Sequence, residues 1–404
     1  MKNKSKPILI FGVIILFSFS LSGQTWSARQ RLTWNTGNSS SPRMAVSSGT
    51  GIHILWSDYT FYKSEILYKN STDRGDTWQP PTRLTWNPNY SKQCDAAGFY
   101  NYVFIVWSDY FSYNNYEIMH KRANVLTSTW DASKRVTWRH GTSSKPSICI
   151  SFKADIGATY TLVHIVWVDE TTGNEEIYYK KGTYQKDKIS ESFYWSELKR
   201  LTWNSSSSRR PVVAVDSNQI IHVIWYDNSS GNTEIYHKRS TDEGVTWSAL
   251  HRLTWTSDPS FELDMTIDSA DRIHIVWYDG PYSSSSLFHK KSTNGGLNWT
   301  GPTRIMWTSP SAAGTSIAAD SSNNLHVLYT DNHTGTDEIY YKKSTNGGLN
   351  WSAPKQLTWN SPGQNFNPNI IVDNSGGLHA AWDGPVFFSE LPGYTHEIFY
   401  KNKK

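Results

Sequence analysis

Residues 211–255 read PVVAVDSNQIIHVIWYDNSSGNTEIYHKRSTDEGVTWSALHRLTW, and this stretch decides the fold. It divides into four short segments, 211–216, 220–227, 233–240 and 245–255, separated by the turns SNQ, NSSGN and TDEG. The segments are rich in β-branched and aromatic residues, which favour strands. Short runs of this kind with turn signals every roughly 8–12 residues predict an antiparallel sheet of four strands.

The pattern of this stretch recurs seven times with a period of about 52 residues. All 20 tryptophans fall on three recurring positions, and Tyr329 occupies the one remaining slot. A four-stranded unit repeated four to eight times is typical of a β-propeller. The predicted fold class is therefore all-β: a seven-bladed β-propeller of four-stranded antiparallel blades. The first tryptophan set is Trp26, Trp78, Trp130, Trp195, Trp247, Trp299 and Trp351; the second ends RLTW-like phrases at Trp34, Trp86, Trp138, Trp203, Trp255, Trp307 and Trp359; the third lies in HIVWYD-like phrases at Trp56, Trp107, Trp167, Trp225, Trp277 and Trp382.

The order of the segments predicts how the ring closes. The copy of the fourth segment at residues 25–34 precedes every other strand, while the final repeat lacks this segment. We expect the N-terminal strand to complete the C-terminal blade, which removes the exposed edges of an open array. Residues 24–404 are then a single propeller domain.

The first 23 residues have the pattern of a signal peptide. Lys2, Lys4 and Lys6 precede an apolar run at 8–21, and small residues follow it. The alternative is an uncleaved anchor, although the run is short for a membrane span. We expect a secreted, periplasmic or cell-surface protein with no membrane span after signal cleavage.

Composition excludes some classes of partner. The chain is 37% hydrophobic and 18% charged, as in a folded protein, with a formal net charge of +4. Three of these charges lie in the leader, so the remainder is close to neutral and offers no electrostatic reason to bind nucleic acid. Cys94 and Cys149 could form a bridge, but buried free thiols are the favoured interpretation. We expect a monomer without a cofactor or metal ion.

The turn between the third and fourth segments resembles a known motif. It reads STDRGDTW at 71–78 and STDEGVTW at 240–247, and STNGGLNW at both 292–299 and 344–351. This phrase resembles the Asp box, or BNR repeat, of sialidase-like β-propellers. The resemblance implies a propeller whose Asp boxes lie in hairpins on the face away from a sialidase active site. Asp73, Asp242, Asn294 and Asn346 are then expected to organise their own turns.

The resemblance also implies what an active site would require: three arginines for a carboxylate, a tyrosine nucleophile assisted by a glutamate, and an aspartate acid/base. The chain offers Arg43 at an inner strand and a weaker second arginine in Arg209 or Arg210, but no third at an equivalent position. Glu262 and Asp264 lie two residues apart on a strand and could pair at the channel mouth. Arg43, Arg210, Glu262 and Asp264 form a candidate set for a divergent exo-glycosidase; the alternative is a solvated channel rim.

A second hypothesis places a binding surface at the hairpins of one rim. An Asp closes each HIVWYD-like phrase, a Glu opens most of the following segments, and the RLTW tryptophan is expected on the same face. Aromatic faces and carboxylates together suit sugars. The alternative is that the acids cap the hairpins and the tryptophans are buried. The ligand-binding candidates are the RLTW tryptophans given above, together with Asp58, Asp109, Asp169, Asp227, Asp279, Asp331 and Asp383.

The sequence therefore predicts an exported, non-catalytic sialidase-like propeller that binds extracellular glycans or proteins. A divergent exo-glycosidase and a structural interaction module of a surface complex remain as alternatives. A histidine recurs in the middle of the second segment in six repeats, one per blade, where ligands cannot converge on a metal ion. It is expected to be structural.

Overall fold

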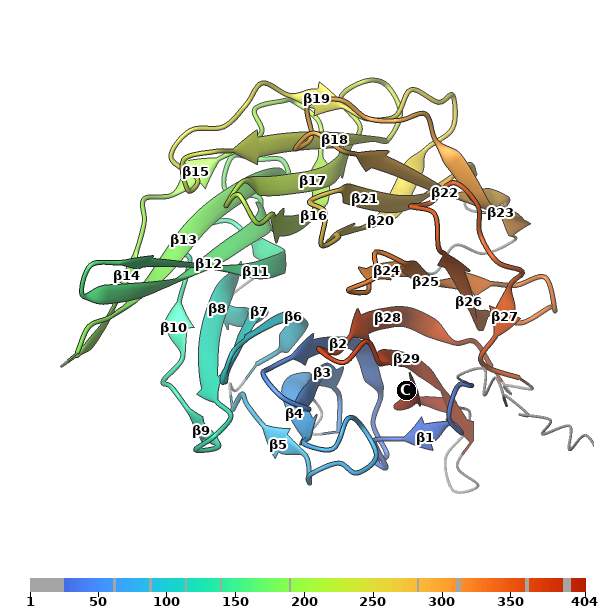
Figure 1. Cartoon of the computed structure of the whole chain (residues 1–404), viewed down its shortest axis with the longest axis horizontal. Coiled ribbons are helices and arrows are strands. Elements are labelled where there is room, and N and C mark those ends of the chain that lie inside the picture. Colours follow the sequence, from blue (N-terminus) through green and yellow to red (C-terminus); the bar gives the residue numbers. More distant parts are fainter. Residues whose placement is uncertain are drawn as a thin grey trace, which may run out of the picture.

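The computed structural model describes residues 25–60, 63–86, 89–112, 115–138, 140–188, 190–281, 283–309, 314–359, 363–387 and 394–404. Their strands form seven antiparallel sheets arranged around a central axis (Figure 1). The predicted all-β, seven-bladed propeller is confirmed. The proposed signal peptide lies outside the described residues. No helix in the described part of the chain has the length and apolar character that a membrane crossing requires.

Four blades are built from strands in simple succession from the axis outward. The first contains β2 (Ser39–Val46), β3 (Ile52–Asp58), β4 (Glu65–Ser71) and β5 (Thr82–Arg83). The fourth contains β16 (Ser208–Val215), β17 (Ile221–Asp227), β18 (Glu234–Ser240) and β19 (His251–Arg252). The fifth contains β20 (Ser260–Ile267), β21 (Ile273–Asp279), β22 (Ser285–Ser292) and β23 (Thr303–Ser309). The sixth contains β24 (Thr315–Ala319), β25 (Leu325–Asp331), β26 (Glu338–Ser344) and β27 (Lys355–Gln356).

The second and third blades have a divided outer edge, because their Asp-box turns are replaced. The second contains β6 (Ser91–Phe99), β7 (Tyr102–Ser112), β8 (Asn115–Asn124), β9 (Thr129–Trp130) and β10 (Lys134–Arg135). The third contains β11 (Ser143–Asp155), β12 (Ala158–Asp169), β13 (Glu176–Lys186), β14 (Glu191–Trp195) and β15 (Lys199–Arg200). The hairpin of β13 and β14 projects from the ring in Figure 1.

The ring closes as the sequence predicts. The seventh blade contains β28 (Phe366–Val372), β29 (Leu378–Phe387) and β30 (Tyr394–Lys403), and its outer strand is β1 (Gln30–Arg31). Gln30 pairs with Tyr400 and Arg31 with Phe399. The first strand of the chain thus covers the edge of the last, and no blade is left incomplete.

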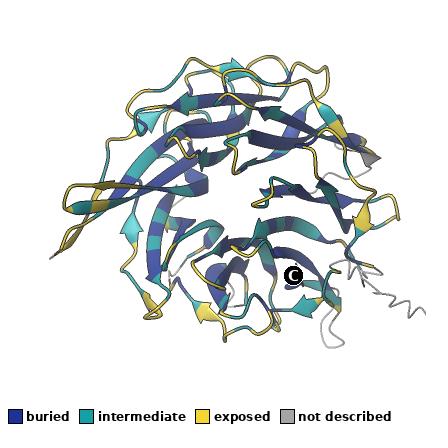
Figure 2. Ribbon diagram, in the orientation of Figure 1, coloured by how far each residue is buried: buried dark blue, intermediate teal, exposed yellow. Residues whose placement is uncertain are grey.

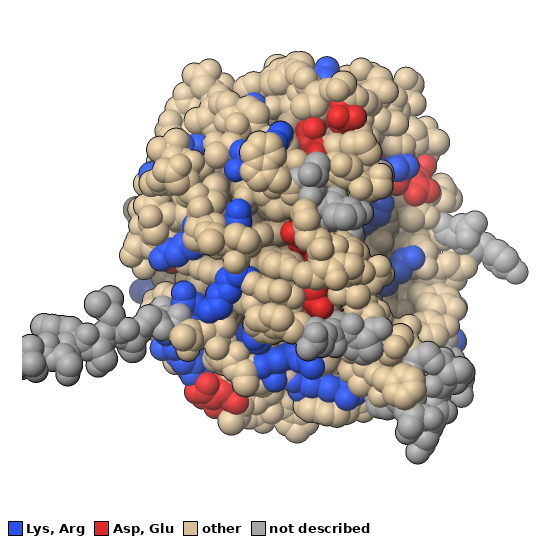
Figure 3. Space-filling model, turned by 90° about the vertical axis from the view of Figure 1, so that its right-hand side faces the viewer, with Lys and Arg blue, Asp and Glu red and all other residues tan. Residues whose placement is uncertain are grey.

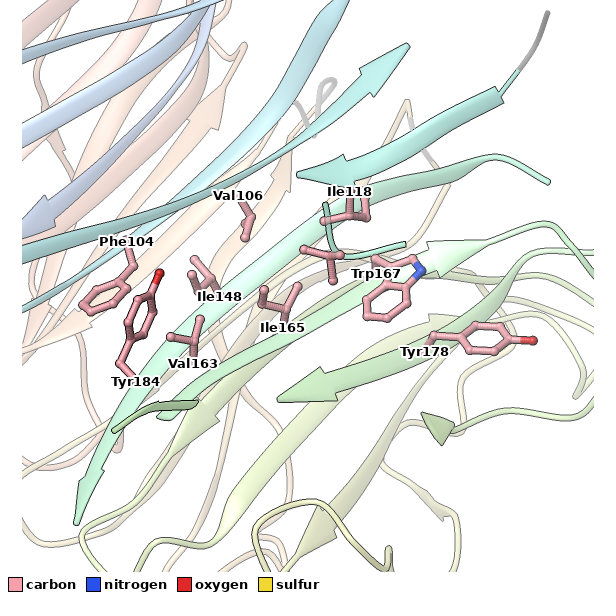
Figure 4. Packing of buried hydrophobic residues seen from close by; sticks show 10 residues of the cluster. Phe104, Val106, Ile118, Ile148, Val163, Ile165, Trp167, Tyr178 and Tyr184 are labelled. Atoms are coloured by element: carbon pink, nitrogen blue, oxygen red, sulfur yellow. The ribbon is translucent and has the colours of Figure 1, made fainter. Parts of the chain in front are cut away.

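The core lies between neighbouring blades, where each sheet packs its faces against two others (Figure 2). Between the second and third blades, Phe104 and Ile118 pack with Ile165 and Trp167 (Figure 4). The HIVWYD tryptophans are all at most 2% exposed. The first tryptophan set is half-buried and contacts aromatic rings of an adjacent blade, as Trp78 does with Tyr400 at 5.0 Å between ring centroids. Both sets are packing residues.

The Asp-box hairpins have the structural role that the sequence indicates. Asp73 Oδ1 accepts a 2.9 Å hydrogen bond from the Thr77 N–H, and Ser71 Oγ accepts a 2.8 Å bond from the Gly75 N–H. Gly75 has φ +85° and faces Tyr400 so closely that a Cβ would lie 1.8 Å from its hydroxyl oxygen. Only glycine fits this position. The hairpin of one blade therefore seats on the preceding blade.

The recurrent histidines and the two cysteines are interior residues. Nδ1 of each repeated histidine contacts a tyrosine hydroxyl or a second histidine on the next strand, as in His53–Tyr68 at 2.7 Å and His222–His237 at 3.1 Å. Burial lowers the pKa of His53 to about 3, so it is neutral at physiological pH. Cys94 and Cys149 are free thiols, and burial raises the pKa of Cys94 to about 12.

Candidate functional site

In six of the seven blades, the pairing of the innermost strand with the second strand shifts register near the start of the innermost strand, which forms a β-bulge close to the ring axis. The register shifts between Ser40 and Arg43 in the first blade and between Phe261 and Asp264 in the fifth. One residue of each bulge has a left-handed backbone, which costs a non-glycine residue about 1 kcal/mol or more. The same backbone conformation recurs at the equivalent position of each blade, so it belongs to the fold and is not a local irregularity. The left-handed residues are Ser41, Gln93, Lys145, Arg210, Glu262, Gly314 and Asn367, one from each blade.

Two residues further along these innermost strands, polar side chains of several blades accept hydrogen bonds from the main chain of the next blade. Asp264 Oδ2 accepts a 2.9 Å hydrogen bond from the Ile317 N–H of the next blade, and Asn369 Oδ1 accepts a 2.8 Å bond from the Met44 N–H. Asp264 Oδ1 also accepts a 2.9 Å bond from its neighbour Met265. Both carboxylate oxygens of Asp264 therefore accept hydrogen bonds from main-chain N–H groups.

The charge of Arg43 affects the pKa values of two buried carboxyl groups. Burial raises the pKa of Asp264, and the pKa of Asp95 is raised for the same reason, against the opposing charge of Arg43 in both cases. The positive charge of Arg43 therefore partly offsets the effect of burial on Asp95 and contributes less at Asp264, where backbone hydrogen bonds oppose burial more strongly. Its Nη1 also donates a 3.0 Å hydrogen bond to the carbonyl of Pro42.

The four candidate catalytic residues lie on the innermost strands of three blades, β2, β16 and β20. Arg210 forms an ion pair with Glu262 across the fourth and fifth blades. Glu262 and Asp264 belong to one bulge, and the charge of Arg43 acts on Asp264. The arrangement joins blades and balances charge. A carboxyl group with a raised pKa could also donate a proton, which is the chemistry that a glycosidase acid needs.

The aspartates of the HIVWYD-like phrases are not placed as sugar ligands would be, because most of them are buried. Asp58 is fully buried, and its Oδ2 accepts hydrogen bonds from Ser39 Oγ at 2.8 Å and Trp56 Nε1 at 3.0 Å, while Oδ1 accepts one from the Thr60 N–H at 3.0 Å. This agrees with the hairpin-capping interpretation. The other six acids of the set occupy the equivalent positions of the second strands, and five of them are also buried: Asp109, Asp169, Asp227, Asp331 and Asp383, with Asp279 half-buried.

The glutamates near the start of the third strands are buried as well. Glu65 is 1% exposed, forms an ion pair with Arg83 and accepts a hydrogen bond from Thr85 Oγ1. Burial raises the pKa of Glu65, and the bonds from Thr85 and Arg83 oppose that change. The arginine of the RLTW phrase therefore locks the outer strand to its own sheet, and the glutamate offers no free carboxylate to a ligand.

The RLTW tryptophans alone among the tryptophan sets are exposed. Trp359 exposes 54% of its surface and Trp307 74%, and the other five lie between these values. The tryptophan follows the outer strand in six blades and lies within β23 in the fifth, and in each blade it comes two residues after a buried Leu, Ile or Val. Seven indole faces therefore stand at the periphery of the ring, one in each blade.

Cations hold these indoles in place. The Lys69 ammonium lies 5.4 Å from the centre of the Trp34 ring, and the Arg31 guanidinium lies 5.7 Å from it. Lys69 comes from the next blade, so the indole spans the groove between two blades. Comparable lysine contacts occur at Trp138, Trp203, Trp255 and Trp359, at 5.0–5.4 Å.

One such groove forms a shallow pocket of about 220 Å³ between the second and third blades. Val136, Thr137 and Trp138 line it from one side, and Lys180 and Leu198 from the other. Pockets that enclose a ligand usually measure about 300–1,000 Å³. A smaller, open pocket with an aromatic wall suits contact with one face of a small ring.

Sequence reasoning missed the lysines of these grooves. Lys69 follows EILY and Lys238 follows EIYH in the third strand, and this position is a lysine in every blade. Regular recurrence was the available signal. Its meaning depended on knowing that this strand lies beside the outer strand of the preceding blade.

Comparisons with known proteins place the fold but not a family. No family model matches the sequence, and no curated protein matches it. Among solved structures, a protein of unknown function from Dyadobacter fermentans has a TM-score of 0.54 at 11% identity, over 95% of this chain and 99% of that one.

Two enzymes that act on carbohydrates have similar structures. An ulvan lyase, from a new polysaccharide lyase family, has a TM-score of 0.55 at 11% identity, over 91% of this chain and 95% of the lyase. An α-L-arabinofuranosidase of Fusarium graminearum has a TM-score of 0.52 at 10% identity, over 93% and 97% of the respective chains. At these identities the likeness establishes a shared propeller fold, of a kind found among carbohydrate-active proteins.

Proposed function

We propose that this protein is a non-catalytic propeller that binds extracellular glycans through its peripheral tryptophans. The observation that carries the proposal is that the RLTW tryptophan is 54–74% exposed in all seven blades, while the other 13 tryptophans are buried or half-buried. A single exposed aromatic residue is ordinary on a protein surface, but exposure of the same tryptophan in all seven blades supports a shared role for this position.

The geometry favours sugars over other small ligands. Each indole presents a flat apolar face that can stack on the C–H face of a sugar ring. At Trp255, the ammonium of Lys290 and the guanidinium of Arg252 lie 5.4 and 5.8 Å from the ring centre, so hydrogen-bond donors for hydroxyl groups stand beside the stacking face. A single open site of this kind binds weakly, and several on one ring provide avidity for a polymer.

The experiment is a glycan array followed by calorimetry with the best oligosaccharide. The proposal predicts binding of polymers, with a stoichiometry above one oligosaccharide per chain, because equivalent grooves recur around the ring. Absence of binding at about millimolar sugar, the range expected of weak single sites, would overturn it.

The proposal includes export by the leader at residues 1–23. Cell fractionation and the mass of the mature protein test this part. A mature chain that begins near residue 24 outside the cytoplasm supports export; an intact chain retained inside the cell contradicts it.

One observation favours glycoside hydrolysis as a second candidate. Asp264 lies at the channel, and burial raises the pKa of its carboxyl group, as expected of a general acid. Fluorogenic sialosides and arabinosides would test this function, with Glu262→Gln as the comparison variant. Release of the fluorophore that Glu262→Gln abolishes would support a glycosidase, and no release by the wild-type protein would exclude this role for the channel.

A further inference from the structure

The groove between the sixth and seventh blades differs from the other grooves in its charge. Arg29 immediately precedes the outer strand β1 of the seventh blade and is exposed. Arg29 lies three residues before the first residue of its LTW phrase, and the other blades carry uncharged residues at this position. These are Pro81, Ser133, Leu198, Leu250, Pro302 and Pro354.

Two further lysines extend this charge. Lys403 pairs with Leu378, the register at which Ser71 pairs with Ile52 in the first blade. The seventh blade thus carries a cation at the register where the first blade carries the serine of its Asp box. Lys355, exposed on β27, pairs with Tyr341 and faces the groove from the sixth blade.

These side chains converge with Lys343 and Lys401 into one cluster, the blade 6–7 basic groove. The Lys401 ammonium lies 5.1 Å from the Trp359 ring centre, and that of Lys403 lies 5.8 Å from Tyr341. Burial lowers the pKa of Lys401, and the positive charges of Arg29 and Lys355 lower it further. Burial likewise lowers the pKa of Lys403, with added effects of Lys343 and Lys355.

The cluster is not neutralised within the described residues. No ion pair with a carboxylate is found there for any of the five cations of the basic groove. Figure 3 views the side of the ring that carries β23 and β27, and it shows Lys and Arg side chains gathered in a band across the lower part of that side. Unbalanced cations that repel one another are stabilised by an anion placed among them.

We propose that the blade 6–7 basic groove binds an acidic polysaccharide, whose carboxylate or sulfate groups contact the cations while one sugar ring stacks on Trp359. This inference rests on the proposed function and adds the ligand class at one groove. Trp359 is 54% exposed beside Lys401, so an apolar face and a positive charge are offered together. A repeating saccharide that alternates apolar ring faces with anionic groups matches both.

The test compares the wild-type chain with the triple variant Arg29→Ala, Lys355→Ala, Lys403→Ser. The last change restores the serine that the Asp-box blades carry at this register. The matched control is Lys199→Ala, at the position of the third blade that corresponds to Lys355. Polygalacturonate and dextran sulfate are the anionic probes, which separate carboxylate from sulfate recognition, and unmodified dextran is the neutral probe.

We expect the triple variant to bind at least one anionic probe about tenfold more weakly, because three positive charges are removed. The Lys199→Ala control should match the wild type. Wild-type binding should also weaken as salt rises from about 0.05 to about 0.5 M, since exposed charges are screened.

Equal binding of the anionic probes by the triple variant and the wild type would overturn the inference. Binding of RNA or of anionic lipid vesicles without binding of either anionic saccharide would do so as well. Failure of the proposed function would appear differently, as absence of binding of neutral glycans together with insensitivity of all saccharide binding to tryptophan substitution.

Discussion

The Nζ atom of Lys69 donates a 2.7 Å hydrogen bond to the main-chain carbonyl of Leu32, across the junction where the ring closes. Lys69 belongs to the first blade, and Leu32 follows the outer strand of the seventh. The same bond recurs from Lys238 to Leu201 at 2.8 Å and from Lys290 to Leu253 at 2.7 Å. One repeated lysine therefore both clasps adjacent blades and supports the exposed indole above it.

The hydrogen bond from Lys69 to the Leu32 carbonyl, which we call the clasp, is predicted to stabilise the contact between the first and seventh blades. Lys69→Met keeps the aliphatic stem but leaves the buried Leu32 carbonyl without this donor, so unfolding free energy should fall by about 1–2 kcal/mol. Urea denaturation followed by fluorescence measures it. Lys63→Met, a substitution outside the clasp, is the comparison, and an equal effect of both variants would contradict the assignment.

The tryptophan sets predict opposite consequences of one substitution. Trp225→Ala removes a fully buried side chain and should destabilise the protein by about 3–5 kcal/mol. Trp255→Ala, at a side chain 64% exposed, should change stability by less than about 1 kcal/mol while weakening glycan binding. Thermal melts and binding assays on both variants distinguish the two roles; similar destabilisation by both would refute the division.

Asp373 predicts an acid-sensitive contact between the seventh and first blades. Its carboxylate binds Arg74 Nε at 2.8 Å, His379 and the Gly377 N–H, and although burial alone would raise its pKa, these bonds hold it at about 2. Because the folded pKa lies below the unfolded value of about 3.9, the contribution is complete above pH 4 and is lost as pH falls towards 2.

The size of this contribution is on the order of 2 kcal/mol. Stability should be measured against pH for the wild type and Asp373→Asn. The variant should be less stable at neutral pH, and the difference should shrink as pH falls from about 4 to about 2. A difference that stays constant over that interval would show that Asp373 is not titrating as described.

The closure of the ring predicts that the N-terminal strand is essential to the fold. Deleting residues 25–34 uncovers the edge of β30, which pairs with β1, and removes buried Leu32. We expect loss of the cooperative thermal transition and association through the free edge. A synthetic peptide of the deleted residues should restore the monomer; an unchanged melt of the truncated chain would contradict this role.

The fold followed from the sequence because its signals are repeated. Seven copies of each tryptophan phrase fix the register of the strands, and the displaced copy at residues 25–34 predicts closure. The role of Asp58 did not follow. Asp58 ends β3, which lies between β2 and β4 in its sheet. The spacing of residues along the chain is the same whether an acid at this position is buried or faces solvent.

The candidate site was predicted in part for a related reason. The exposure of Trp34 could not be derived from alternation, because the regular outer strand is only two residues long and the chain leaves the sheet before the indole. The blade 6–7 basic groove was missed because Arg29, Lys355 and Lys403 come from opposite ends of the chain and meet only when the ring closes.

The central claim is that the exposed tryptophans bind glycans, and one variant tests it most directly. All seven RLTW tryptophans, at positions 34, 86, 138, 203, 255, 307 and 359, would be replaced by alanine and the purified protein applied to the same glycan array as the wild type. The account predicts a folded protein with a cooperative melt and no glycan binding. A folded variant that still binds the wild-type glycans would contradict it.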